Sequence, residues 1–297
     1  MTRHNTPRVC FIGFGEAGQA FASGFREGGI ERIAAWDILF PESEGRPLRE
    51  AGERLGVRLG TSAADALEGA EVVLSAVTAA SSLEAARSAK AHLSGQFYFD
   101  LNSVSPGRKR ESAQLLGAAA RYVDVAVMAP VHPARNQTPL LLAGPHVEGA
   151  EQLAAALGMR ASKAGAEIGA AAAIKMVRSV MIKGLEALTQ ECFLAAARAG
   201  IVSEVMASLS KSLPGLDWPR TIEYNLERMA VHGIRRAAEM EEVAETLREL
   251  GIEPLMAEAT VGRQRDMGRL GKLSEIREAT TGSYKTLLAA ISAAARA

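Results

Sequence analysis

The segment RVCFIGFGEAGQAFASGF, residues 8–25, decides the fold. It joins a short apolar run to a helical run through Gly13, Gly15 and Gly18, spaced as GxGxxG. In a strand–turn–helix unit the first glycine permits a tight turn, the second lets the backbone approach a pyrophosphate, and the third allows close helix-to-strand packing. The segment therefore predicts a dinucleotide-binding turn, in which a helix N-terminus presents free N–H groups to phosphate.

An acidic residue follows this turn. Asp37 lies in IAAWDI, about 20 residues beyond the glycines, where such proteins place the carboxylate that binds a ribose. That carboxylate would repel a 2′-phosphate, and the next arginine is Arg46, so the sequence favours NAD, with NADP as the alternative. An ordinary glycine turn and a solvated loop acid are the structural alternatives. The predicted cofactor residues are Gly13, Phe14, Gly15, Glu16, Ala17, Gly18, Asp37, Val77 and Thr78.

Short β-rich runs alternate with helical segments up to about residue 165. These runs are RVCFI (8–12), IAAWDI (33–38), EVVLSAV (71–77), QFYFDL (96–101), YVDVAV (122–127) and PLLLAG (139–144). Such alternation is typical of βαβ units, and apolar runs without a polar face indicate strands covered by helices on both sides. We expect an α/β Rossmann domain with a mostly parallel sheet over residues 1–165.

The remainder, residues 166–297, is predicted to be an all-α domain. Alanine, leucine, glutamate and arginine recur there at helical spacing, and the first helix is expected over roughly 167–198. Glycine and proline predict where the helices end. The expected breaks are at Gly200, 213–215, 218–219, Gly233, 251–254, Gly271 and Gly282.

Composition excludes several classes of partner. The 297 residues are 48% hydrophobic and carry no formal net charge, so neither nucleic acid nor an anionic membrane is an expected partner. Two cysteines without a CxxC pair support neither a disulfide framework nor a metal site. No signal peptide or membrane span is evident. We expect a cytoplasmic protein that binds a small molecule.

A single lysine interrupts the alanine-rich segment GAAAAIKMVRS, residues 169–179. An ammonium group desolvated among alanines can have its pKa lowered, which suits the side chain of Lys175 to proton transfer. The structural alternative is a lysine that extends from an amphipathic helix into water.

With the glycine turn, the segment DLNSVSP (100–106) and Lys175, the chain resembles the β-hydroxyacid dehydrogenase family. Relatives include 3-hydroxyisobutyrate dehydrogenase and 6-phosphogluconate dehydrogenase, and the phosphogluconate-dehydrogenase-like branch is the most similar. The resemblance implies a Rossmann domain that binds NAD(P), a helical domain that forms a homodimer, and a substrate between them. It also implies that Lys175 is the catalytic acid/base in the interconversion of a β-hydroxy acid and its carbonyl form.

The same resemblance assigns substrate residues. The family's serine-rich loop falls on Asn102 and Ser103, and its asparagine one helical turn beyond the lysine falls on Ser179. The glycine-containing stretch that binds substrate carboxylates in the family is replaced here, over 124–130, by DVAVMAP. Because proline lacks an N–H and glycines are missing, this chain is expected to have a rebuilt pocket.

Several residues and functions stay open at this level. Roles in the substrate site or on solvated surfaces are both compatible with His132, Arg178, His232, Arg235 and Arg236. An imine reductase of the same architecture is the first alternative function, although such relatives usually have another residue in place of the lysine. A non-catalytic dinucleotide sensor is the second.

Overall fold

The computed structural model describes residues 6–294. These residues form two compact units, which meet between Met176 and Val177 inside the long helix α7, Ala170–Ala199.

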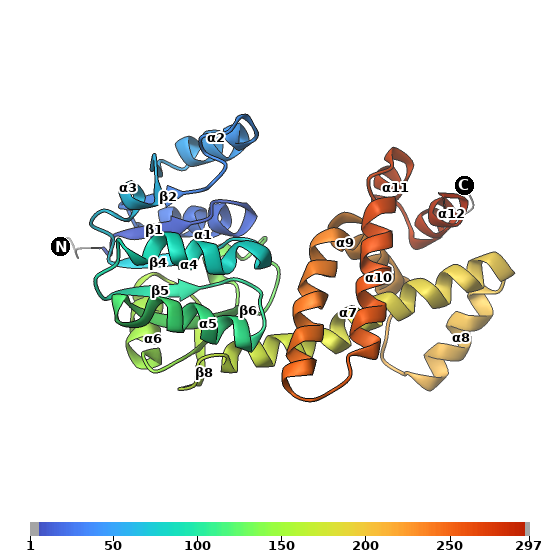
Figure 1. Ribbon diagram of the computed structural model, residues 1–297. Helices are drawn as coiled ribbons and strands as arrows, with labels where there is room; N and C mark the ends of the chain where they lie inside the picture. The colour runs from blue at the N-terminus through green and yellow to red at the C-terminus, as the bar shows by residue number, and fades with distance from the viewer. Residues whose placement is uncertain (1–5, 295–297) are drawn as a thin grey trace. The chain divides into compact units, whose positions relative to one another are not determined.

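An eight-stranded sheet forms the centre of the first unit (Figure 1). Its strands are β1 (Val9–Ile12), β2 (Ile33–Trp36), β3 (Arg58–Leu59), β4 (Val72–Ser75), β5 (Gln96–Asp100), β6 (Ala120–Val127), β7 (Leu140–Ala143) and β8 (Ala161–Gly165). Their order is β3-β2-β1-β4-β5-β6-β7-β8, and every neighbouring pair is parallel except β6 and β7. The predicted, mostly parallel Rossmann sheet is confirmed.

Helices cover both faces of this sheet, because successive strand side chains point to opposite sides. The first unit contains α1 (Glu16–Glu27), α2 (Arg46–Arg54), α3 (Ala63–Leu67), α4 (Ser82–Lys90), α5 (Pro106–Leu116) and α6 (Val147–Ala156), with 3₁₀ turns η1 (Ser43–Gly45), η2 (Ala79–Ser81), η3 (Gly117–Ala119) and η4 (Arg135–Gln137). Phe11 packs with α1 and α6 on one face, and Cys10 packs with α3, α4 and α5 on the other. This two-sided burial explains the uniformly apolar runs.

The strand order reverses between β1 and β4. In open parallel sheets, ligands bind outside the carboxyl ends of the strands at such a reversal. The glycine turn follows β1, and the loop containing Val77 follows β4. Both therefore lie at the end of the sheet where a ligand is expected.

The second unit is helical throughout its described residues. After the larger part of α7 it contains α8 (Val202–Ser212), α9 (Trp218–Glu249), α10 (Leu255–Leu270), α11 (Ser274–Ala279) and α12 (Tyr284–Ala294). Phe193, Leu226, Met267 and Ile291 belong to a buried apolar cluster of this unit.

The predicted helix break at Gly233 is wrong, because this glycine lies inside the continuous helix α9. A Cβ there would lie 2.3 Å from the carbonyl oxygen of Gln264 in α10 and 2.7 Å from the backbone nitrogen of Gly268. Gly233 therefore permits close contact between α9 and α10, which lie side by side in Figure 1. The break predicted at 218–219 is instead the start of α9, since Pro219 occupies a first-turn position.

Candidate functional site

The three glycines of the turn have distinct structural roles. Gly13 has φ +90°, and a Cβ there would lie 2.5 Å from the carbonyl oxygen of Ala76. A Cβ on Gly18 would lie 2.7 Å from the carbonyl oxygen of Gly13. By contrast, a Cβ on Gly15 would meet no heavy atom within 4 Å. Gly13 and Gly18 are thus required for packing inside the protein, whereas the space beside Gly15 is open.

This geometry fits a dinucleotide pyrophosphate. Gly15 is the N-cap of α1 and has no side chain to cap it, and the N-terminus of a helix presents backbone N–H groups and a positive dipole end to an anion. Phe14 is buried in the core and Ala17 packs against it, while the side chain of Glu16 is exposed. Phe14, Glu16 and Ala17 would therefore contribute backbone groups instead of side chains.

Asp37 lies directly beside the glycine turn. One carboxylate oxygen accepts a hydrogen bond from the backbone N–H of Phe14 at 2.7 Å, and the other accepts one from Leu39 at 3.0 Å. The acid therefore follows β2 in contact with the glycine loop. Arg46 pairs with Glu50 at 2.8 Å. Arg49 donates to the backbone oxygens of Phe40 and Glu42.

The loops after β4 and β5 are joined by Asn102. Its side-chain oxygen accepts from the backbone N–H of Val77 at 2.7 Å, and its amide nitrogen donates to the hydroxyl of Ser75 at 3.0 Å. Asn102 is 3% exposed. Thr78 is exposed, and its hydroxyl bonds that of Ser81 at 3.0 Å. The side chain of Asn102 thus fixes the backbone at the carboxyl ends of two strands.

Lys175 and Ser103 meet although 72 positions separate them in the sequence. The ammonium of Lys175, on the second turn of α7, donates to the hydroxyl of Ser103 at 2.5 Å. Both residues are partly buried, so neither is fully hydrated nor fully withdrawn from solvent. In the same loop Ser105 caps α5 by accepting from the backbone N–H of Arg108 at 3.2 Å.

A buried ionic cluster lies beneath this pair and was not predicted from the sequence. Lys109 of α5 lies 3.0 Å from Asp100 and 3.5 Å from Asp124, and the hydroxyl of Tyr122 donates to Asp100 at 2.7 Å. Burial and the neighbouring Asp100 raise the pKa of Tyr122, which keeps the phenol protonated as a donor. A usable signal was present, since QFYFD and YVDVAV each place an acid inside an otherwise apolar strand.

The first residue of the stretch 124–130 is not accessible to a ligand. Asp124 is fully buried, and its second oxygen accepts from the backbone N–H groups of Gly169 and Ala172, each at 3.1 Å. Farther along the stretch, the backbone N–H of Met128 donates to the backbone oxygen of Pro139 at 2.9 Å. Pro130 and His132 are exposed.

The second unit contains the remaining residues that the sequence singled out. Ser179 is 6% exposed and lies one helical turn beyond Lys175 in α7. Arg236 is buried and pairs with Glu186, so a solvated helix face is wrong for this residue. Arg178 and Arg235 are exposed and His232 is partly exposed.

Lys183, which is buried, forms an ion pair with the partly buried Glu239 in this unit, at 2.8 Å. Burial lowers the pKa of Lys183, and the carboxylate of Glu239 opposes that shift. The carboxylate of Glu239 is therefore engaged within the protein.

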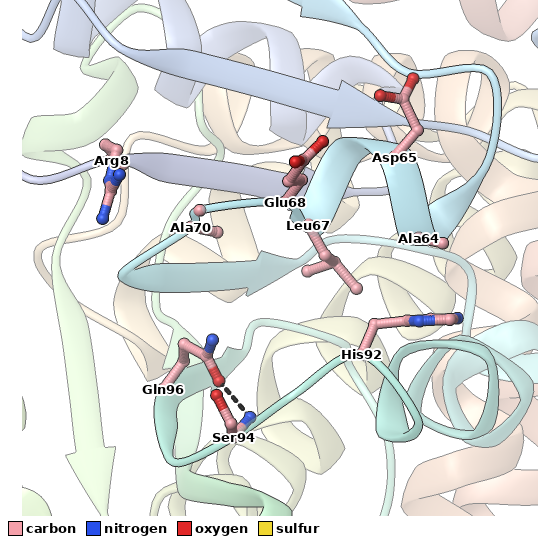
Figure 2. Close-up of a pocket in the computed structure, with 10 residues that line it drawn as sticks. Arg8, Ala64, Asp65, Leu67, Glu68, Ala70, His92, Ser94 and Gln96 are labelled. Carbon is pink, nitrogen blue, oxygen red and sulfur yellow. Dashed lines mark hydrogen bonds between the residues drawn. The ribbon is translucent and has the colours of Figure 1, made fainter.

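A hollow of about 690 Å³ lies at the opposite end of the sheet (Figure 2). Arg8, Glu68, His92 and Gln96 are among the residues that line it. Since Arg8 precedes β1 and the glycine turn follows it, this hollow is separate from the site at the carboxyl ends of the strands.

Residues 6–294 contain neither a membrane-spanning helix nor a metal-binding cluster of side chains. No helix there is long and apolar enough to cross a bilayer. No set of three or more histidine, cysteine, aspartate or glutamate side chains in this part of the chain is arranged to hold a metal ion.

Taken with its switch-point location, the glycine cradle defines a dinucleotide-binding protein of the Rossmann class. A family model described as NADP oxidoreductase, coenzyme F420-dependent, matches residues 8–103. A domain of unknown function, DUF1932, matches residues 196–267. The first match includes the glycine turn, and the second lies in the helical unit.

Two solved structures are similar over nearly their whole length. A conserved hypothetical protein from Sinorhizobium meliloti 1021 is 34% identical, with a TM-score of 0.76 over 97% of this chain and 96% of that one. A conserved protein of unknown function, described as structurally similar to 3-hydroxyacid dehydrogenases, is 32% identical, with a TM-score of 0.68 over 90% of this chain and all of that one. The chain belongs to the β-hydroxyacid dehydrogenase family and thereby to the NAD(P)-dependent oxidoreductases.

More distant structures agree in fold alone. Mycobacterium tuberculosis 3-hydroxyisobutyrate dehydrogenase with L-serine is 14% identical, with a TM-score of 0.72 over 96% of this chain and 99% of that one. An imine reductase from Aspergillus terreus, in complex with NADPH4 and dibenz[c,e]azepine, is 18% identical, with a TM-score of 0.57 over 90% of this chain and 96% of that one.

Proposed function

We propose that the protein interconverts a β-hydroxy acid, or a related small hydroxylated compound, and its carbonyl form by hydride transfer. The observation that carries this proposal is the contact between Lys175 and Ser103 beside the carboxyl ends of β4 and β5. A bound nicotinamide would supply the hydride acceptor or donor. The glycine turn and Asp37 would hold its dinucleotide.

Lys175 acts as the proton-transfer group in this proposal. In oxidation its neutral amine accepts the hydroxyl proton, and in reduction its ammonium donates a proton to the carbonyl oxygen. The hydroxyl oxygen of Ser103 accepts from the lysine nitrogen, and the same hydroxyl can donate its proton to a substrate oxygen. Partial burial of both groups strengthens such hydrogen bonds relative to bulk water.

Asn102 takes a different part in the same proposal. Because its oxygen and nitrogen bond Val77 and Ser75, we assign it to positioning the two loops instead of contacting substrate. Ser179 remains a candidate substrate residue through its place one turn after Lys175.

Asp37 should determine the choice of dinucleotide. NAD(H) is expected to bind more tightly than NADP(H), because a carboxylate beside the glycine turn opposes a 2′-phosphate. Asp37→Ala should lower the ratio of the NADP(H) to the NAD(H) dissociation constant roughly tenfold, the effect of removing one partly screened charge interaction. Calorimetric titration of both dinucleotides measures the ratio.

Asp37→Asn is the matched variant for that experiment, because it removes the charge while its amide oxygen can still accept from Phe14. It should lower that ratio as much as Asp37→Ala does. A clear preference of the parent protein for NADP(H) would contradict the assignment.

An exposed apolar face on α7 supports the proposal that the protein is a homodimer. Large apolar side chains recur every three or four residues and are 45–63% exposed: Ile174 45%, Val177 48%, Met181 63%, Leu185 49% and Leu188 54%. A row of this kind lies on one side of a helix. A second copy of the chain is the proposed occupant, since family relatives dimerise and two-fold assembly is the commonest.

Leu185→Glu should convert the dimer into a monomer at micromolar concentration, because it places a charge in the centre of that face. Light scattering measures the mass. Leu250→Glu is the control, since Leu250 is 59% exposed at the end of α9 and should tolerate the charge. A monomer mass for the parent protein, the same as that of Leu185→Glu, would exclude the dimer.

Cys192 offers an independent probe of the same interface, four residues beyond Leu188 on this face. Burial raises the pKa of the Cys10 thiol to about 12, so a maleimide at neutral pH should label Cys192 alone. Labelling should be slow in the parent dimer and fast in Leu185→Glu.

A screen of hydroxy acids, carbonyl compounds and imines, read by the absorbance of NADH and NADPH, tests the proposed reaction. Turnover of imines alone would favour the imine reductase, whose fold the chain shares. Tight NADH binding without turnover would favour a dinucleotide sensor.

A further inference from the structure

A chain of buried charges links the loop that contains Ser103 to the helix that contains Lys175. Lys109 donates to the backbone oxygen of Asp100 at 2.6 Å and to its carboxylate at 3.0 Å, and it lies 3.5 Å from one oxygen of Asp124. The side chains of these three residues are at most 1% exposed. They therefore form a closed cluster under the candidate site.

One end of this cluster lies three residues before Ser103, and the other end bonds a residue three positions before Lys175. Asp100 ends β5, and Ser103 follows three residues later. At the other end Asp124 accepts from the backbone N–H of Ala172 at 3.1 Å, and Lys175 follows three residues later, about 4.5 Å along the helix axis. The cluster thus spans the two backbone segments whose side chains must meet.

Lys109 is the only cation among the described residues shown to contact both carboxylates. Burial raises the pKa of Asp124 and the neighbouring Asp100 raises it further, whereas Lys109 and the N–H groups of Ala172 and Gly169 lower it. Removing Lys109 would leave two buried carboxylates together, and such a pair shares a proton. A neutral Asp124 would hold the positive end of α7 less firmly.

We propose that Asp100, Lys109 and Asp124 form a positioning cluster that holds the first turn of α7 and thereby sets the contact between Lys175 and Ser103. The inference rests on the proposed function of that pair. A purely stabilising role is a weaker account, because buried ion pairs often add little stability relative to apolar residues of similar volume. Lys109 bonds Asp100 at one end and Asp124 at the other, and Asp124 in turn accepts from the backbone of α7.

Hydrogen exchange of the backbone amides at 166–176, measured by mass spectrometry on the full-length protein, tests the proposal. Asp124→Asn should speed exchange at Gly169 and Ala172 about 5–30-fold, because a neutral amide lacks the roughly 1–2 kcal/mol that the carboxylate's charge adds to these hydrogen bonds and to its attraction for the helix N-terminus. Lys109→Met should produce a similar increase, because it leaves Asp124 without its counterion beside a second buried carboxylate. Glu186→Gln is the control, since it breaks a buried ion pair of the second unit and should leave these amides unchanged.

Kinetics provide a second readout. With the substrate found by the screen, Asp124→Asn should lower kcat about tenfold while the dissociation constant for NADH, from its fluorescence, stays within twofold. If Lys109→Met fails to fold, the isosteric Asp124→Asn decides alone. Parent-like exchange in the folded Asp124→Asn protein, or an equal change in Glu186→Gln, would overturn the proposal. Full activity of Lys175→Ala would instead defeat the proposed function and leave the exchange result standing.

Discussion

Lys175→Ala should lower kcat by about 10²–10⁴-fold, the usual contribution of general acid–base catalysis. The loss is expected because the lysine nitrogen is the group that reaches the hydroxyl of Ser103 at the carboxyl ends of the strands. The dissociation constant for NADH should change little, since the glycine turn and Asp37 lie on other segments. Steady-state turnover beside NADH fluorescence separates the two effects.

Lys175→Arg should not restore activity, because a guanidinium remains protonated near neutral pH and cannot accept the hydroxyl proton during oxidation. Lys163→Ala is the control: this lysine pairs with Glu148 on the surface at 2.9 Å, and such exposed pairs contribute little. Near-parental turnover in Lys175→Ala would remove the lysine from the mechanism while leaving the fold assignment intact.

Gly15→Ala should weaken dinucleotide binding about 5–150-fold without lowering the melting temperature. The added methyl group meets no protein atom within 4 Å, and Gly15 has φ −72°, which any residue adopts. In the complex it would occupy space that the pyrophosphate needs, and such overpacking typically costs 1–3 kcal/mol. Calorimetry gives the affinity, and thermal unfolding without ligand gives the stability.

Gly13→Ala is the matched variant and should behave differently, because its methyl group would lie 2.5 Å from the carbonyl oxygen of Ala76 at φ +90°. It should destabilise the protein even without ligand, as expected of a residue forced into a left-handed conformation. Equal NADH affinity in Gly15→Ala and the parent protein would show that the pyrophosphate does not bind there.

The strands were predictable because they are short, apolar and bounded by glycine or polar residues. Burial on both faces left a continuous apolar signal in strands such as β1 and β4. The sequence analysis missed β3, with two residues, and β8, whose segment ASKAG is half-exposed at the sheet edge. Neither carries a periodic apolar pattern, so their pairing depends on neighbouring strands.

Single glycines were harder to interpret. Gly233 was predicted as a helix break, yet it lies inside α9 against the backbone of α10. The sequence offers the same residue for a break and for close helix packing, and the contact with Gly268 decides between them only in three dimensions.

The part of the candidate site formed by residues close together in the sequence was predictable. The glycine turn and Asp37 come together as their spacing suggested. The roles of Asp124 and Lys109 could not be predicted from their neighbours in sequence. Lys109 lies on a helix, whereas Asp100 and Asp124 lie on two different strands, and only the folded chain brings the three together. A buried ionic contact of this kind has no fixed spacing.

The most direct test of the proposed reaction follows the transferred hydrogen itself. NADH deuterated at the carbon that donates the hydride is incubated with the protein and a panel of β-keto acids, aldehydes and imines, and the products are analysed by mass spectrometry. The account predicts deuterium on the carbinol carbon of a hydroxy product, formed at least about 10²-fold more slowly by Lys175→Ala. Deuterium found only in amine products, or in no product of a protein that binds NADH, would contradict it.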